Sequence, residues 1–148
     1  MTINYNQEIN MKSLVLSFFM LLSFKTFATE SGLVIQNATI RIPPPAITTT
    51  AMFLKITNKS SQDVGLLKVS GDFAGNFELH TMEMAGGKMK MRPLNMIEVK
   101  KKSSVELQSG GMHIMIFNVK KPLKAGEIYK VKMLFNNKQE IEVDAKVI

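Results

Sequence analysis

Cysteine is absent from this chain of 148 residues. Disulfide bonds, thiolate metal ligands and a cysteine nucleophile are therefore excluded. Three common signatures of catalysis are missing as well: the Gly-x-Ser-x-Gly elbow, the glycine-rich phosphate loop and the His-Glu-x-x-His motif. We therefore expect that the chain is not an enzyme, that it has no catalytic residues and no organic-cofactor site, and that its stability comes from its hydrophobic core.

Helical periodicity is absent too, because no stretch after residue 28 keeps it over three turns. Short segments with alternating apolar or β-branched residues are separated instead by glycine, proline and asparagine turns. This pattern predicts a single all-β domain, an antiparallel β-sandwich or barrel. The expected strands are 33–42, 48–57, 64–70, 76–82, 89–92, 97–99, 104–107, 112–119, 127–135 and 139–148.

The N-terminal region contains an apolar run at residues 14–24, preceded by Lys12 and followed by small residues, Thr26 and Ala28, at the −3 and −1 positions of a cleavage site. This arrangement is typical of a secretory signal peptide, and an uncleaved anchor is the competing interpretation. We expect a signal peptide at residues 1–28, with Met11 as an alternative start, and a mature domain at residues 29–148. No cysteine follows the run, so we expect neither a lipoprotein anchor nor a stable membrane anchor after cleavage.

The chain is basic, with nineteen Lys and Arg residues against twelve Asp and Glu residues and a formal net charge of +7. A basic chain suggests nucleic acid as a partner, but the export signal argues against that partner. The run Lys100-Lys101-Lys102 lies between two expected strands. It is interpreted either as a solvated turn or as a docking patch for an acidic protein.

Both histidines of the chain are followed by methionine two residues later, as His80-Thr81-Met82 and His113-Ile114-Met115. Side chains at i and i+2 of a strand point to the same face, so each step presents an imidazole and a thioether together. This donor set suits a soft cation, Cu(I) above all. Isolated histidines and methionines are nevertheless more often structural residues than ligands.

A hairpin is predicted at Gly86-Gly87, the clearest turn signal in the chain. The hairpin would bring the strand that carries His80 against the thioethers of Met89 and Met91. His80 is then expected to be a cross-strand or diagonal neighbour of one of these methionines.

The spacing of these residues has a specific pattern: ten residues separate His80 from Met91, twenty-one separate Met91 from His113, and one separates His113 from Met115. The pattern resembles the motif His-x10-Met-x21-His-x-Met of the periplasmic copper chaperones of the PCu(A)C type. The resemblance extends over nearly the whole mature region and includes residues 38–41, 79–94, 110–115 and 123–127.

The resemblance implies a cupredoxin-like Greek-key β-sandwich in the periplasm that binds one Cu(I) near its surface. Carried over by position, the implied metal ligands are His80, Met91, His113 and Met115. It also implies a transient protein acceptor, the copper subunit of cytochrome c oxidase, to which copper would be delivered at the binuclear copper site.

Several neighbours of the motif have two interpretations. Met82 or Met89 is expected to pack beside the site or to act as a spare thioether, and Met84 to face the end of the hairpin. The alternative is that all three are packing residues. Glu78 shares the strand face of His80, so it either orients the imidazole or is simply exposed. Arg41 is expected to brace the edge of the sandwich.

Two other functions compete with copper delivery. One is a periplasmic copper buffer or resistance protein that has the same site but no dedicated acceptor. The other is a metal-free β-sandwich interaction module in which the histidines and methionines are structural.

Overall fold

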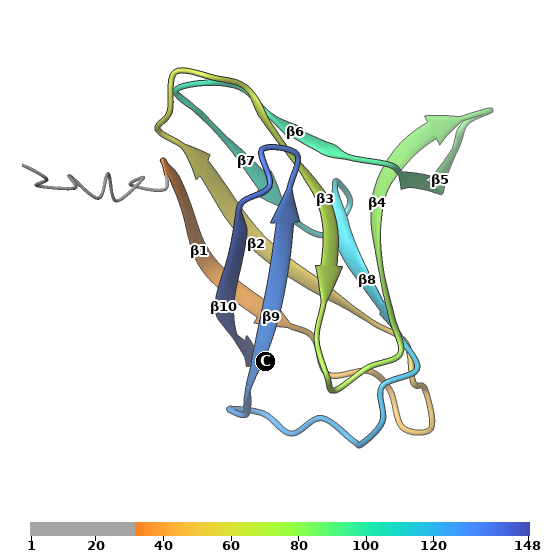
Figure 1. Ribbon diagram of the computed structural model, residues 1–148. Helices are drawn as coiled ribbons and strands as arrows, with labels where there is room; N and C mark the ends of the chain where they lie inside the picture. Colours follow the sequence, from red (N-terminus) through yellow and green to blue (C-terminus); the bar gives the residue numbers. More distant parts are fainter. Residues whose placement is uncertain (1–31) are drawn as a thin grey trace, which may run out of the picture. The chain divides into compact units, whose positions relative to one another are not determined.

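The computed structural model describes residues 32–148, so the expected signal peptide lies outside the described residues. The described chain consists of ten strands joined by turns and loops (Figure 1). They are β1 (Leu33–Ile40), β2 (Thr50–Asn58), β3 (Val64–Ser70), β4 (Asn76–Ala85), β5 (Lys88–Leu94), β6 (Ile97–Val99), β7 (Ser103–Leu107), β8 (His113–Phe117), β9 (Ile128–Phe135) and β10 (Glu140–Val147). Within residues 32–148, no helix is long and apolar enough to cross a membrane.

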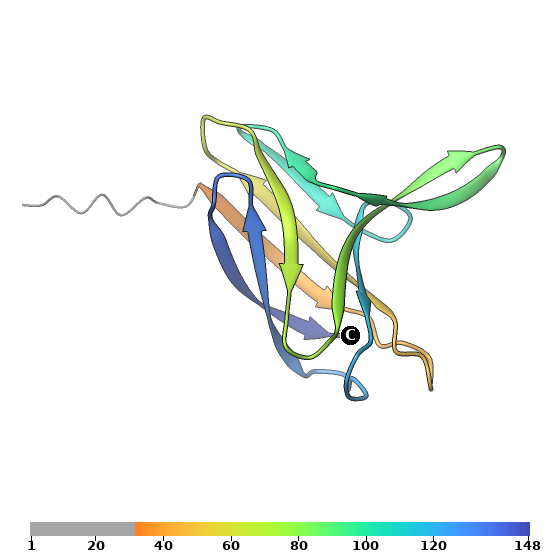
Figure 2. The same cartoon turned by 45° about the vertical axis from the view of Figure 1, so that its right-hand side comes forward.

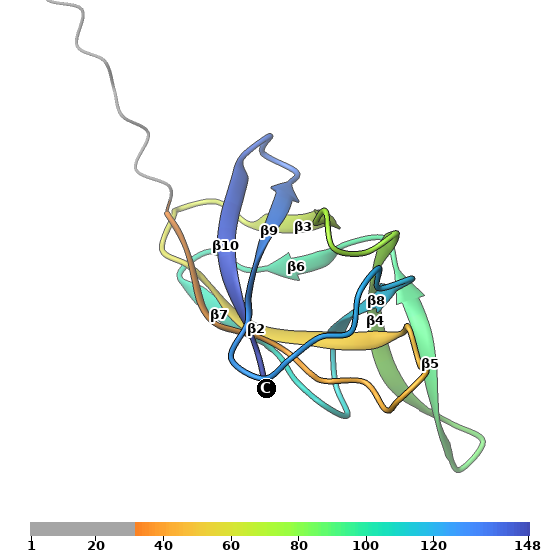
Figure 3. The same cartoon turned by 90° about the horizontal axis from the view of Figure 1, so that it is seen from below.

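The strands form one continuous sheet in the order β5-β4-β8-β2-β1-β10-β9-β3-β6, with β7 added to β2. The sheet folds over itself, so that β2, β8 and β4 form one layer and β9, β3 and β6 the other (Figure 3). The predicted all-β sandwich is confirmed. Among the described strands, β1 and β10 pair in parallel and the other pairs are antiparallel.

The core lies between the two layers because alternate residues of the strands are apolar. On β2, Met52, Leu54 and Ile56 are buried, while the residues between them are only partly buried. On β8, Ile114 and Ile116 are fully buried in the same core. Since side chains alternate across a strand, the remaining residues of β2 and β8 face away from the core.

Turn chemistry sets where the strands end. The first strand ends at Ile40, two residues earlier than predicted, although Arg41 still donates its backbone N–H to Ala51 over 3.0 Å. The Pro43-Pro44-Pro45 connection follows.

The predicted hairpin is present, and β4 extends to Ala85 because Gly86 and Gly87 close a two-residue turn with φ of 61° and 74°.

The β4–β5 hairpin projects from the body of the sandwich (Figure 2). All the residues of β5 except Leu94 are exposed.

The Lys100-Lys101-Lys102 run is an exposed connection between β6 and β7, as the solvated-turn interpretation expected. Lys100 forms ion pairs with Asp63 and Glu98.

Candidate metal centre

The two histidines lie side by side on neighbouring strands. His80 on β4 is directly opposite His113 on β8, and the centroids of their rings are 6.0 Å apart. Only 9% of His80 and 5% of His113 is exposed. Their strand neighbours Leu79 and Ile114 are buried in the core. The two imidazoles therefore share the face of the sheet that points away from the core.

Hydrogen bonds fix which ring nitrogen of each neutral histidine carries the lone pair. The Nε2 of His80 lies 2.9 Å from Oε2 of Glu78, and the Nδ1 of His113 lies 2.9 Å from the carbonyl oxygen of Gly111. A carboxylate or a carbonyl oxygen only accepts, so these two nitrogens donate. The lone pairs are then on Nδ1 of His80 and Nε2 of His113. Nδ1 of His80 is buried and has no hydrogen-bond partner in residues 32–148.

The predicted thioethers lie on the same face. Met115 is two residues from His113 on β8, and it lies opposite Glu78 on one side and Ala51 on the other. Met91 on β5 lies opposite Met82, which is two residues from His80 on β4. Met91 is thus a diagonal neighbour of His80, as the hairpin predicted.

A hollow of about 250 Å³ opens beside these donors. Three of the predicted ligands line it, and the fourth, His80, lies directly opposite His113 across the β4–β8 ladder. Met82, whose role the sequence left open, lines the hollow as well. The lining residues are Arg41, Ala51, Phe53, Met82, Met91, Ser109, Gly110, His113 and Met115.

Arg41 and Phe53 form a wall of the hollow that the sequence did not predict. The guanidinium of Arg41 lies 5.6 Å from the centre of the Phe53 ring, a cation–π arrangement. From the sequence, Arg41 is predicted only to brace the sandwich edge. Phe53 lies two residues from Ala51 on the outward face of β2, and this strand periodicity was the one signal that could have placed it near the site.

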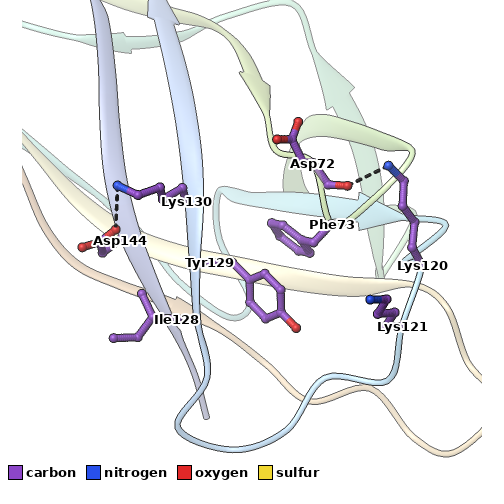
Figure 4. A pocket seen from close by; sticks show the side chains of 8 residues that line it. All are labelled: Asp72, Phe73, Lys120, Lys121, Ile128, Tyr129, Lys130 and Asp144. Atoms are coloured by element: carbon purple, nitrogen blue, oxygen red, sulfur yellow. Dashed lines mark hydrogen bonds and ion pairs between the residues drawn. The ribbon is translucent and has the colours of Figure 1, made fainter.

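A larger hollow of about 670 Å³ contains none of these donors (Figure 4). It lies over β9, β10 and the loops before β4 and after β8, and several of its polar groups have partners within the protein. Lys120 donates to the carbonyl of Asp72, Lys130 pairs with Glu142 and Asp144, and Tyr129 donates to Glu127. The lining residues are Asp72, Phe73, Lys120, Lys121, Ile128, Tyr129, Lys130 and Asp144.

The donor set around His80 and His113 suits one class of metal. Residues 32–148 contain no group of three or more His, Asp or Glu side chains arranged to hold a metal ion. Hard cations such as Mg²⁺ and Ca²⁺ require oxygen donors, which Asp and Glu in a group of this kind would provide. Two imidazoles with free lone pairs, on a sheet face that also carries thioethers, are instead suited to a soft monovalent cation.

Comparison with known proteins gives a family. The family model described as "Putative lipoprotein LpqE-like" matches residues 33–147. A curated relative, the uncharacterized protein RP573 of Rickettsia prowazekii, is 24% identical over 102 residues. The match covers 68% of this chain and 56% of that protein, so the chain spans little more than half the length of this relative.

Solved structures with the same fold include copper-binding domains. The Cu(I) form of DR1885 from Deinococcus radiodurans is 31% identical, with a TM-score of 0.62 over 81% of this chain and 82% of that one. The copper-bound PCuAC domain of PmoF2 is 18% identical, with a TM-score of 0.68 over 78% of this chain and 92% of that one. The chain belongs to the LpqE-like family and is a cupredoxin-like β-sandwich of the PCuAC type.

Proposed function

We propose that this protein is a metallochaperone that carries one Cu(I) through His80, Met91, His113 and Met115. The observation that carries the proposal is the buried Nδ1 of His80, which has a lone pair and no partner among the described residues. This nitrogen belongs to a ring 6.0 Å from that of His113, on a sheet face that also presents thioethers. A buried unpaired acceptor is unfavourable unless something binds it, and a metal ion does so.

The arrangement suits transport better than permanent storage. All four donors are neutral, so bound Cu(I) keeps its single positive charge and is held less tightly than by a pair of thiolates. Two donors are held firmly, because the imidazoles are buried and each donates a hydrogen bond to an oxygen. Met91 is different, since 46% of it is exposed. Its thioether is the donor that an incoming ligand would replace first.

The wider role that we propose is export to the periplasm, with the signal peptide at residues 1–28, and delivery of copper toward the binuclear site of cytochrome c oxidase. The kinship with PCuAC domains supports an envelope role. Delivery is tested by deletion of the gene. Reduced oxidase activity at low copper supports delivery, whereas copper sensitivity with normal oxidase activity supports a buffer and contradicts a dedicated acceptor.

Copper binding is tested by competition with a chromogenic Cu(I) chelator. The purified protein should bind one Cu(I), and both His113→Ala and Met91→Leu should weaken binding. Met96→Leu is the matched control, because Met96 is also exposed but lies outside the hollow. Failure to bind Cu(I) would favour a metal-free interaction module. Equal affinity in all the variants would contradict the assignment of His113 and Met91 as ligands.

A further inference from the structure

Four methionines form a continuous stripe on one face of the β4–β5 hairpin. Met82 lies opposite Met91, and Met84 lies opposite Met89, one step nearer the turn. Residues at i and i+2 share a face, so both pairs lie on the face that carries His80. The stripe begins at the turn with Met84 and Met89, which we call the hairpin pair, and reaches the proposed copper centre through Met82 and Met91.

The register brings the side chains within each pair close together. The residues that flank a two-residue turn form a hydrogen-bonded pair, here Ala85 with Lys88, and pair types then alternate along the ladder. The hairpin pair is therefore of the non-hydrogen-bonded type, as is Met82 with Met91, and in this type the Cα atoms are only about 4.5 Å apart. Pro93 lies opposite His80, and by the same alternation this is also a non-hydrogen-bonded pair. The alternation therefore agrees with the fact that Pro93 has no N–H to donate.

Packing does not explain the hairpin pair. Met84 is 68% exposed and Met89 is 48% exposed, although the interior is the usual place for a methionine side chain. The charged side chains nearest the turn lie on the other face of the hairpin, where Arg92 pairs with Glu83 over 3.2 Å. The alternation of β5 places Lys88 and Lys90 on that other face as well. Two thioethers are thus left exposed, close together and away from these ammonium groups.

We propose that the hairpin pair is a second and weaker soft-cation site, which captures Cu(I) at the turn and passes it inward. The direction of transfer rests on the proposed function of the His80–His113 centre. Successive pairs along the stripe are roughly 7 Å apart, two residues of a strand. Methionine has three flexible side-chain torsions, so thioethers of adjacent pairs can exchange one ion between them.

The transfer needs no redox step. Cu(I) stays Cu(I), and each thioether bond that breaks is replaced by a bond to the next thioether or imidazole. The imidazoles of the centre provide nitrogen donors that the hairpin pair lacks, so the ion is bound more tightly at the inner end. A weak outer site beside a tight inner one directs copper toward the centre.

The test is a titration of the purified protein with Ag(I), a stable soft-cation probe, followed through ¹³C-labelled methionine methyl signals. The first equivalent should shift the signals of Met91 and Met115, and a second equivalent should shift those of Met84 and Met89. The double variant Met84→Leu/Met89→Leu keeps the apolar bulk. It should lose the second equivalent and keep the first, while Met96→Leu should keep both.

The outcomes separate this proposal from the proposed function. If Met84 and Met89 do not shift at two equivalents, or if the double variant still binds the second, the hairpin site is wrong while the inner centre stands. If Met84 and Met89 shift but Met91 and Met115 do not, the hairpin site is supported and the inner centre is wrong. As a kinetic readout, the double variant should take up Cu(I) from a chelator more slowly than wild type at unchanged final occupancy; equal rates would exclude capture.

Discussion

At the scale of single residues, the carboxylate of Glu78 decides how His80 can act. Its Oε2 accepts the Nε2–H of His80 at 2.9 Å, and its Oε1 accepts an N–H of Asn76 at 2.8 Å. The carboxylate therefore holds the ring in one tautomer and increases the electron density on Nδ1. The sequence placed Glu78 on the same strand face but left its contact with the ring open, and the structure supports the orienting role.

Glu78→Gln is predicted to weaken Cu(I) binding by about 10- to 100-fold, because a neutral amide supports the imidazole less well than a carboxylate. The measurement is Cu(I) affinity by competition with a chelator. Glu83→Gln is the control, since Glu83 is on the other face of β4 and pairs with Arg92. Equal affinity in the two variants would contradict the role assigned to Glu78.

Cu(I) affinity is predicted to fall as the pH is lowered from 7 to 5. An imidazole that has gained a proton has no lone pair for a metal, whereas thioethers do not titrate in this range. The measurement is the same competition at several pH values, with the chelator's own pH dependence corrected. A flat profile in wild type would contradict histidine ligation. A shallower dependence in His113→Ala than in wild type would assign part of the pH dependence to His113, with the rest left to His80.

At the scale of secondary-structure elements, the turn between β6 and β7 is joined to Asp63 just before β3. One carboxylate oxygen of Asp63 accepts the backbone N–H of Lys101 at 2.8 Å, and the other is 3.2 Å from Nζ of Lys100. These interactions, first of all the backbone hydrogen bond from Lys101, lower the pKa of Asp63 below its ordinary value. The ionised form of Asp63 is thus favoured by folding.

A carboxyl group whose pKa is lowered in the folded protein stabilises the fold fully above its ordinary pKa and loses this effect as the pH falls through the folded-state value. Asp63→Asn is therefore predicted to be less stable than wild type at neutral pH, with a difference that shrinks below about pH 4. Urea unfolding at several pH values measures this. Asp72→Asn, at an exposed carboxyl, is the control, and a difference for Asp63→Asn that does not change with pH would be contrary to the argument.

Asn58, at the end of β2, is a fully buried polar residue that joins this strand to β6 and to the loop before β3. Its Nδ2 donates to the carbonyls of Gln62 at 2.8 Å and Val99 at 3.1 Å, and its Oδ1 accepts the N–H of Ser60 at 2.9 Å. Asn58→Ala leaves these groups unpaired and should lower the free energy of unfolding by roughly 1–3 kcal/mol.

Denaturant unfolding checks the Asn58 prediction. Asn137→Ala is the matched control, because Asn137 makes comparable hydrogen bonds with Gln139 in an exposed turn. Asn137→Ala should lower the free energy of unfolding by less than Asn58→Ala does, since water can replace these hydrogen bonds. A cost for Asn58→Ala no greater than that for Asn137→Ala would mean that burial of the amide has no energetic role.

At the scale of the whole molecule, much of the sandwich followed from local sequence patterns. The alternation around Met52 and the turn at Gly86-Gly87 are each set by neighbouring residues, so the strands and the hairpin were predictable. The parallel pairing of β1 with β10 was not, since it joins the two ends of the domain. The wall formed by Arg41 and Phe53 also depends on packing between strands that spacing along the chain does not encode.

The candidate site was also predictable from the sequence only in part. The resemblance of the spacing to the PCu(A)C motif implied the four proposed ligands, and strand periodicity placed each histidine with the methionine that follows it. Two details needed three-dimensional registers: His80 directly opposite His113, and Met82 opposite Met91 in the lining of the hollow. The free lone pair on Nδ1 of His80 follows only from the position of the Glu78 side chain.

The most direct test of the central claim is X-ray absorption at the copper edge of the Cu(I)-loaded protein. The account predicts one copper bound by two imidazole nitrogens and two thioether sulfurs, with one sulfur fewer in Met91→Leu and one imidazole fewer in His113→Ala. A copper environment without sulfur, or one unchanged by both substitutions, would contradict the proposed centre.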